Sequence, residues 1–296
     1  MKEEDVRGVK TYATAAIAAV VLAGLWAVEG CKSEGQGVAK QAVTVKGSDT
    51  MVHLASAWAE AFMKKNPQAE IAVTGGGSGT GIAALLNGTT DVCTASRKIE
   101  AKELQQAAAR KIEPKEFIVA LDGIAIAVNP ANPLNEITIE QLRKIYVGTY
   151  ANWKDVGGPD EAIVLLSRES SSGTYVFFQE RVLDKKDYAR SARLMPATSA
   201  IIQEVSASKG AIGYVGLGYA AEAKSKVKVL KVKKQDGAAA IEPSVETVVS
   251  GKYPILRPLN LYTRGEPAGA VKTFVDFCLS PEGQQIVKET GYVPVR

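Results

Sequence analysis

Residues 42–95 read AVTVKGSDTMVHLASAWAEAFMKKNPQAEIAVTGGGSGTGIAALLNGTTDVCTA. Short apolar runs rich in β-branched residues predict three strands, at 42–46, 70–74 and 91–95. Apolar residues at helical spacing predict the two intervening helices, one that follows Thr50 and ends at Lys65-Asn66-Pro67 and one over 82–87. This alternation of strands and helices predicts an α/β fold built on a parallel sheet.

The same alternation continues to the end of the chain. Further strands are predicted at 117–128, 163–167, 211–215, 227–232 and 256–263, and further helices at 100–110, 139–146, 173–182, 199–208, 269–279 and 281–290. The long apolar segments 117–128 and 256–263 are expected to carry the chain to a second lobe and back. We therefore expect two α/β lobes with a ligand cleft between them, lobe I from 43–125 plus 256–296 and lobe II from 126–255.

The composition excludes several classes of function. Hydrophobic residues make up 46% and charged residues 23% of the 296 residues, which is typical of a globular protein, and the net charge of +4 is too weak and dispersed for a nucleic-acid partner. The single histidine, His53, and three cysteines without a CxxC pair argue against catalysis and metal binding. We expect a monomeric protein that is not an enzyme and has no catalytic residues, metal or cofactor, and we leave open whether Cys93 and Cys278 pair.

The N-terminus resembles an export signal. An apolar run at 13–28 ends just before Cys31, as in a bacterial lipoprotein signal, although Glu29 departs from that pattern. We expect residues 1–30 to be a signal peptide, Cys31 to be the lipid anchor and residues 31–42 to be a tether. Ordinary cleavage and a retained membrane anchor are the alternatives. All three place the folded part in the periplasm or on the outer face of the cytoplasmic membrane.

Three turns that carry serine, glycine and threonine each lie where a strand ends and a helix begins. The candidate binding residues in them are Ser48, Asp49, Thr50, Ser78, Ser172, Gly173 and Thr174. Free backbone N–H groups and the positive end of the helix dipole favour an anion at such positions, and hydroxyl groups add further donors. A single turn of this kind is usually only a helix cap. Three together predict a nest for a small oxyanion.

Two arginines follow predicted strands next to these turns. Arg168 is placed to hold two oxyanion oxygens in a fork, with a surface ion pair to Glu169 as the alternative. Arg97 is a second cationic candidate. A nucleotide site is disfavoured, because residues 75–81 lack the lysine of a Walker A loop and Arg97 occupies the region where a dinucleotide fold carries an acidic residue.

Six segments together resemble the PstS family, the phosphate-binding proteins of bacterial phosphate ABC transporters. They are residues 45–51, 75–81, 91–97, 152–158, 168–174 and 280–284. The resemblance runs from about residue 43 to 295 and implies a two-lobed type II periplasmic-binding-protein fold that closes over inorganic phosphate. It implies delivery of phosphate to the permease and ATPase subunits of an importer. It also matches phosphate-binding positions to Ser48 to Thr50, Ser78, Arg168, Ser172, Gly173 and Thr174.

One position departs from the best-known branch of that family, which carries an aspartate after the Ala-Ser of the third strand to accept the phosphate proton. Here Arg97 follows Ala95-Ser96. Asp49 is the candidate acceptor in its place, with a plain helix cap as the alternative. Other tetrahedral oxyanions (sulfate, molybdate or tungstate), a phosphate-sensing module and a hydrolase remain the competing hypotheses for function.

Overall fold

The computed structural model describes residues 41–295. The expected leader 1–30, Cys31 and all but the last two residues of the expected tether lie outside these residues. The tether boundary is wrong by those two residues, since the first strand already begins at Gln41.

Strands and helices alternate along most of the described chain. The strands are β1 (Gln41–Gly47), β2 (Ala69–Thr74), β3 (Val92–Ala95), β4 (Lys115–Val128), β5 (Glu136–Thr138), β6 (Val164–Arg168), β7 (Arg193–Met195), β8 (Ala211–Gly216), β9 (Lys228–Lys233), β10 (Ala240–Ile241) and β11 (Leu256–Thr263). The α-helices are α1 (Val52–Lys65), α2 (Ser78–Asn87), α3 (Ala101–Ala109), α4 (Ile139–Tyr146), α5 (Gly173–Arg181), α6 (Thr198–Ala207), α7 (Leu217–Glu222), α8 (Val245–Val249), α9 (Gly269–Leu279) and α10 (Pro281–Glu289). Two short 3-10 helices, η1 (Asp49–Met51) and η2 (Trp153–Val156), complete the set.

The sheet is mixed. Its main path runs β2-β1-β3-β11-β4-β8-β6-β7, and β9 joins it through β4. The outer neighbours β2-β1-β3 and β8-β6-β7 are parallel, whereas β11 is antiparallel to β3 and β4, and β4 is antiparallel to β8. The prediction of a parallel sheet is therefore wrong at its centre, because β4 and β11 carry the chain in opposite directions between the two parallel portions.

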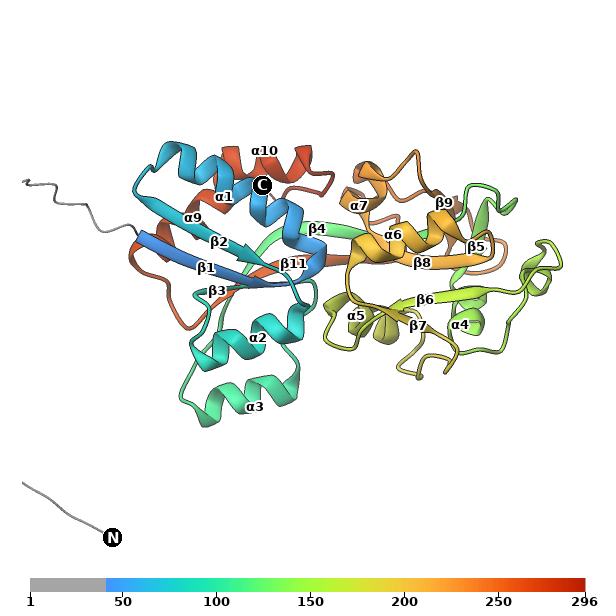
Figure 1. Cartoon of the computed structure of the whole chain (residues 1–296), viewed down its shortest axis with the longest axis horizontal. Coiled ribbons are helices and arrows are strands. Elements are labelled where there is room, and N and C mark those ends of the chain that lie inside the picture. Colours follow the sequence, from blue (N-terminus) through green and yellow to red (C-terminus); the bar gives the residue numbers. More distant parts are fainter. Residues whose placement is uncertain (1–40, 296) are drawn as a thin grey trace, which may run out of the picture. The chain divides into compact units, whose positions relative to one another are not determined.

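β4 and β11 lie side by side and join the two parts of the sheet (Figure 1). β4 pairs with β11 as far as Gly123 and from Ile124 onwards pairs with β8 and β9. This change of strand partner between Gly123 and Ile124 is close to the predicted lobe boundary after residue 125. The residue limits of the lobes stay a prediction.

Hydrophobic residues form separate clusters on either side of the point where β4 changes its strand partner. Two clusters draw on residues 43–120 and 259–292, one beneath α1, α9 and α10 and the other beneath α2 and α3. The other two draw on residues 124–255 and Val293. Burial of apolar surface in two places at once is what allows one chain to form two lobes around paired crossing strands.

Most predicted elements lie within two residues of the observed ones, with one functional exception. α2 begins at Ser78, so the predicted glycine-rich turn 75–81 is a turn only as far as Gly77. The sequence reading missed several short elements, including β5, β10 and α7, because two to six residues show too little periodicity to be recognised. Within residues 41–295, no helix combines the length and apolarity needed to cross a membrane.

Candidate anion-binding site

The three serine-bearing turns meet in the folded chain. Thr50 Oγ1 and Thr174 Oγ1 are 2.9 Å apart, and the amide of Gly79 donates to the carbonyl of Ser171 over 2.9 Å. Gly173 lies so close to the second turn that a Cβ there would overlap the hydroxyl oxygens of Ser78 and Ser96. Helix starts from α1, α2 and α5 therefore converge on one place, as the sequence predicts.

The hydroxyl groups of this cluster are removed from solvent. Of its side chains the most exposed is Ser172, at 3%, and the other members are Ser48, Thr50, Ser78 and Thr174. Burial lowers the local dielectric and strengthens the interaction of each donor with an anion. The backbone amides of Thr50, Ser78 and Gly173 have no acceptor in the described part of the chain. The cluster therefore combines neutral O–H and N–H donors at three helix starts.

The cap interpretation holds for only one of the three serines. Ser172 caps α5, since its Oγ accepts from the amides of Thr174 and Tyr175. Ser48 makes no side-chain cap bond, and Ser78 is inside α2, where its Oγ accepts from the amide of Ser96 over 3.0 Å. Since an oxygen that accepts these bonds keeps its own hydrogen, the hydroxyl of Ser172 remains available as a donor, whereas that of Ser78 lies 3.3 Å from Ser96 Oγ and either oxygen can donate in that bond.

Arg168 ends β6 and is almost fully buried. Its Nη2 donates to Asp49 Oδ2 over 2.7 Å and to the Pro196 carbonyl, while Nε donates to the Met195 carbonyl and Nη1 to Thr198 Oγ1. A guanidinium has five N–H donors, so one remains without a partner. The ion pair expected with Glu169 as the alternative is not observed, and in this arrangement Arg168 offers an anion one donor rather than a fork.

Asp49 does not cap a helix. Its side chain instead accepts from the amide of Gly76 over 3.0 Å and from Arg168, and its carbonyl accepts from the hydroxyl of Tyr219. Burial, reinforced by the nearby Asp49 charge, raises the pKa of Tyr219 to about 12, so this phenol stays a donor at neutral pH. Asp49 therefore lies among the predicted site residues with a carboxylate held in place by two donors. Its role as the proton acceptor stays a prediction.

Arg97 lies beside the cluster with its charge already matched. Its guanidinium forms two bonds of 2.7 Å with Glu103 and lies 3.3 Å from Glu100, while its Nε is buried without a partner. Burial alone would lower the pKa of Arg97, but these two carboxylates raise it. Within residues 41–295, the bonds of the Arg97 side chain go to Lys98, Glu100 and Glu103 and not to the hydroxyl cluster, and phosphate contact by Arg97 stays a prediction.

The sequence reading missed a buried ion pair on the crossing strands. Arg257 of β11 and Asp122 of β4 face each other in the strand register, are both fully buried and are joined by bonds of 2.8 and 3.0 Å. Burial raises the pKa of Asp122, and Arg257 opposes this effect. A charged residue inside each of two apolar strand segments was the available signal, because charged side chains are rarely buried without a partner.

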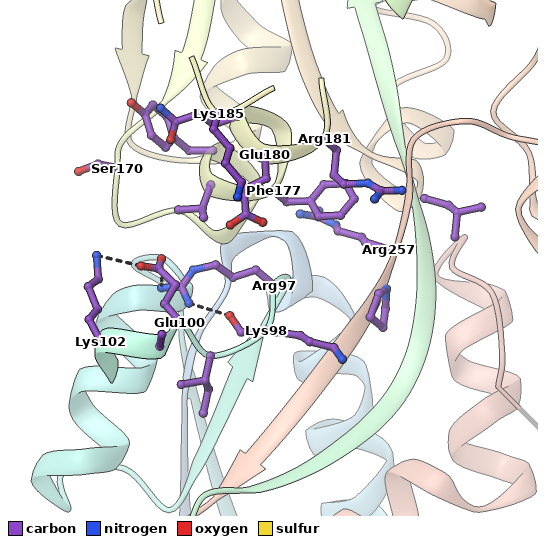
Figure 2. A pocket seen from close by; sticks show the side chains of 17 residues that line it. Arg97, Lys98, Glu100, Lys102, Ser170, Phe177, Glu180, Arg181, Lys185 and Arg257 are labelled. Atoms are coloured by element: carbon purple, nitrogen blue, oxygen red, sulfur yellow. Dashed lines mark hydrogen bonds and ion pairs between the residues drawn. The ribbon is translucent and has the colours of Figure 1, made fainter. Parts of the chain in front are cut away.

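An open pocket of about 960 Å³ lies beside the cluster (Figure 2). It shares Arg97 and Arg257 with the surroundings of the hydroxyls, and its lining carries more basic than acidic groups. The basic residues are Arg97, Lys98, Lys102, Arg181, Lys185 and Arg257, and the acidic ones are Glu100 and Glu180. Arg97, Arg257 and Lys102 have carboxylate partners, so the charge that can attract anions towards the site comes from Lys98, Arg181 and Lys185.

Two cysteines and one histidine are further nucleophilic or metal-binding side chains of the described residues. Cys93 and Cys278 are buried free thiols, and burial raises the pKa of both. His53 pairs with Glu222 and stacks on Tyr219 at a mostly exposed position. No group of three or more histidine, cysteine, aspartate or glutamate residues suited to a metal ion occurs within residues 41–295.

Fold and site together define a solute-binding protein, and the comparisons with known proteins agree. The sequence model of the PBP superfamily domain matches residues 32–282. The phosphate-binding protein PstS of Bacillus subtilis is 35% identical over 267 residues, which cover 89% of this chain and 84% of the relative. The chain belongs to the PstS family of phosphate-binding proteins.

Solved structures give the same relationship. A Clostridium perfringens protein assigned as the substrate-binding protein of a phosphate ABC transporter was crystallised with bound phosphate. It is 32% identical, with a TM-score of 0.78 over 86% of this chain and all of that one. An ABC-type phosphate transport receptor from Vibrio cholerae is 30% identical, with a TM-score of 0.68 over 85% of this chain and 99% of that one. The type II periplasmic-binding-protein fold expected from the sequence is confirmed.

Proposed function

We propose that this protein captures inorganic phosphate outside the cytoplasm and delivers it to an ABC importer. One observation carries the proposal. Five buried hydroxyl groups and backbone amides at three helix starts gather in the turns that also carry the Arg168–Asp49 ion pair. Such a site offers many donors and one carboxylate acceptor. Phosphate, which keeps a proton near neutral pH, needs both kinds of partner.

The carboxylate is what favours phosphate over the other tetrahedral oxyanions. Sulfate has no proton to donate at neutral pH, so a fixed carboxylate beside it is an unfavourable contact. The donors alone are indifferent to the central atom. The proposed phosphate ligands are Ser48, Asp49, Thr50, Ser78, Arg97, Arg168, Ser172, Gly173 and Thr174. Among them, Asp49 is the acidic residue.

Calorimetric titration of the purified protein with phosphate, sulfate, arsenate and molybdate tests the proposal. We expect one phosphate per chain and much weaker binding of sulfate and molybdate. If the protein bound sulfate or molybdate tightly and did not bind phosphate, its ligand would be a different oxyanion and the proposal would be wrong. A colorimetric phosphatase assay on the same preparation is expected to show no turnover.

Access to the buried hydroxyls requires the two sides of the site to separate. Asp49 and Thr50 lie between β1 and α1, whereas Arg168 ends β6 and Thr174 is in the first turn of α5, and residues of the two sides are in direct contact. We infer that phosphate closes the lobes over itself, as expected for a hinged binding protein. Small-angle scattering should show a smaller radius of gyration after addition of saturating phosphate, and an unchanged radius would contradict closure.

The remaining parts of the proposal concern the cellular setting. We propose that the partners are the membrane permease and ATPase subunits of a phosphate ABC transporter and that the chain acts as a monomer. We also propose that Cys31 is lipidated, which would hold the folded part at the outer face of the membrane. Reconstitution with the transporter and phosphate uptake into vesicles would test the delivery step.

A further inference from the structure

Arg257 contacts both sides of the proposed phosphate site without belonging to either turn. Its Nη1 donates to Thr174 Oγ1 and to the carbonyl of Ser96, each over 3.0 Å, and its Nη2 donates to Thr50 Oγ1 over 3.3 Å. Thr50 precedes α1 and Thr174 opens α5, so a single guanidinium contacts hydroxyls from both sides.

The guanidinium is itself held by Asp122 and by the ring of Phe177. Asp122 accepts from its Nε over 3.0 Å and from its Nη2 over 2.8 Å, and the other oxygen of Asp122 accepts from the amide of Leu217. The ring of Phe177 lies 5.6 Å from the guanidinium carbon, which allows a cation–π contact, and both side chains lie on the pocket wall in Figure 2. Arg257 is therefore fixed in position and its charge is compensated.

The hydrogen positions on the two threonines follow from the chemistry of arginine. A guanidinium donates and never accepts, so both threonine oxygens act as acceptors towards Arg257. The 2.9 Å bond between Thr50 Oγ1 and Thr174 Oγ1 uses one of the two hydroxyl hydrogens. The other hydrogen has no acceptor in the described part of the chain. The threonine pair is thus left as a donor towards whatever lies in the site.

We propose that Arg257, held by Asp122, is a positioning residue that fixes the Thr50–Thr174 hydroxyl pair so that its one remaining hydrogen is donated to the bound anion. The proposal rests on the proposed function, because the acceptor is an oxygen of phosphate. Without Arg257 the hydroxyls can rotate, and each can point either a hydrogen or a lone pair at the anion. With Arg257 in place the orientation that suits an unprotonated oxygen is fixed before the anion arrives, which lowers the entropic cost of binding.

A double-mutant cycle tests whether Arg257 acts through the hydroxyls. Arg257→Gln combined with Asp122→Asn replaces the buried ion pair by a neutral pair of similar size and avoids an unpaired buried charge. We expect this neutral pair to weaken phosphate binding about tenfold by calorimetry, and Thr174→Val to weaken it by a similar factor. The combination of all three substitutions is expected to be little worse than either alone. Losses that multiply to about a hundredfold would overturn the proposal.

Two further variants separate positioning from charge and from stability. Arg257→Lys keeps the positive charge but lacks the planar fork, so it should bind phosphate almost as weakly as the neutral pair. Full affinity in this variant would overturn the proposal. Tyr253→Phe is the matched control, because it removes a buried hydrogen bond of 2.7 Å to the carbonyl of Ile124 without touching the site.

The control should lower the melting temperature and leave phosphate affinity unchanged. If Tyr253→Phe weakens phosphate as much as the neutral pair does, the effect is one of strand stability and the inference fails. A wild-type protein that does not bind phosphate would instead refute the proposed function. Circular dichroism confirms that every variant is folded before its affinity is compared.

Discussion

Asp49→Asn is expected to narrow the preference for phosphate over sulfate. The carboxylate accepts from the amide of Gly76 over 3.0 Å and from Arg168 over 2.7 Å. Asparagine keeps one acceptor oxygen, and its amide nitrogen cannot accept from Arg168 or from protonated phosphate. Loss of a hydrogen bond to a charged group costs about 1.5–3 kcal/mol, which is roughly a tenfold to hundredfold weakening of phosphate binding.

Sulfate should respond in the opposite sense. Removal of the carboxylate removes its repulsion, and the buried Arg168 loses the counter-charge that it has in the described structure. Arg168 then attracts any dianion more strongly, phosphate included, so the ratio of the two affinities is the diagnostic quantity rather than either affinity alone. We expect that ratio to fall at least tenfold.

Competition titrations at neutral pH on wild type and Asp49→Asn measure the ratio. Asp160→Asn is a suitable control, since it removes an exposed carboxylate that pairs with Asn152 and Lys154, neither of which is a proposed ligand. A mutant that rejects sulfate as firmly as wild type would show that Asp49 is structural and that selectivity lies elsewhere. If the ratio of the two affinities changed equally in Asp160→Asn, the effect would come from the net charge of the protein and not from the loss of a carboxylate in the site.

Three further predictions follow from the site and its surroundings. Arg168→Ala should weaken phosphate binding by about 2–5 kcal/mol in calorimetry, because it leaves a buried carboxylate unpaired, and Ser172→Ala should cost less; the reverse order would make the arginine mainly structural. The double variant Lys98→Glu, Lys185→Glu should slow phosphate association about tenfold in stopped-flow experiments at low salt and leave the dissociation rate unchanged. If the association rate of the wild type did not depend on salt, electrostatic attraction of phosphate by these lysines would be contradicted. Mass spectrometry of membrane-extracted protein should find acyl chains on Cys31, and a mature N-terminus elsewhere without acyl mass would show that Glu29 blocks lipidation.

The sequence predicts the turns of the site well because local chemistry determines them. A strand, a short glycine- and serine-containing turn and a helix are set by neighbouring residues, and α5 begins at the predicted Gly173. Convergence of the turns also follows from the fold class, since helix starts in an α/β sheet gather at the carboxyl ends of the strands. The start of α2 is wrong by four residues because glycine at 79 and 81 lowers helix propensity while tertiary contacts keep those residues helical.

The partners of the charged residues are not predictable in the same way. Arg168 pairs with Asp49 across 119 positions of sequence, and Arg257 pairs with Asp122 across 135. No periodicity or spacing links such residues, and only the antiparallel register of β4 and β11 brings the second pair together. The pairing of Arg97 was not predicted for the same reason. Its position beside the predicted turns suggests that it binds an anion, whereas Glu103 on the following helix compensates its charge.

These pairings change how the site is expected to hold an anion. Three buried arginines lie in or beside the hydroxyl cluster, and each has a carboxylate within 2.8 Å: Arg97 with Glu103, Arg168 with Asp49 and Arg257 with Asp122. Since the opposite charges cancel within each pair, the anion is held mainly by the dipoles of hydroxyl groups, amides and helix starts. Dipoles at short range are little affected by salt, whereas the exposed lysines of the pocket act over distances that salt screens. Salt should therefore slow phosphate association much more than it speeds dissociation.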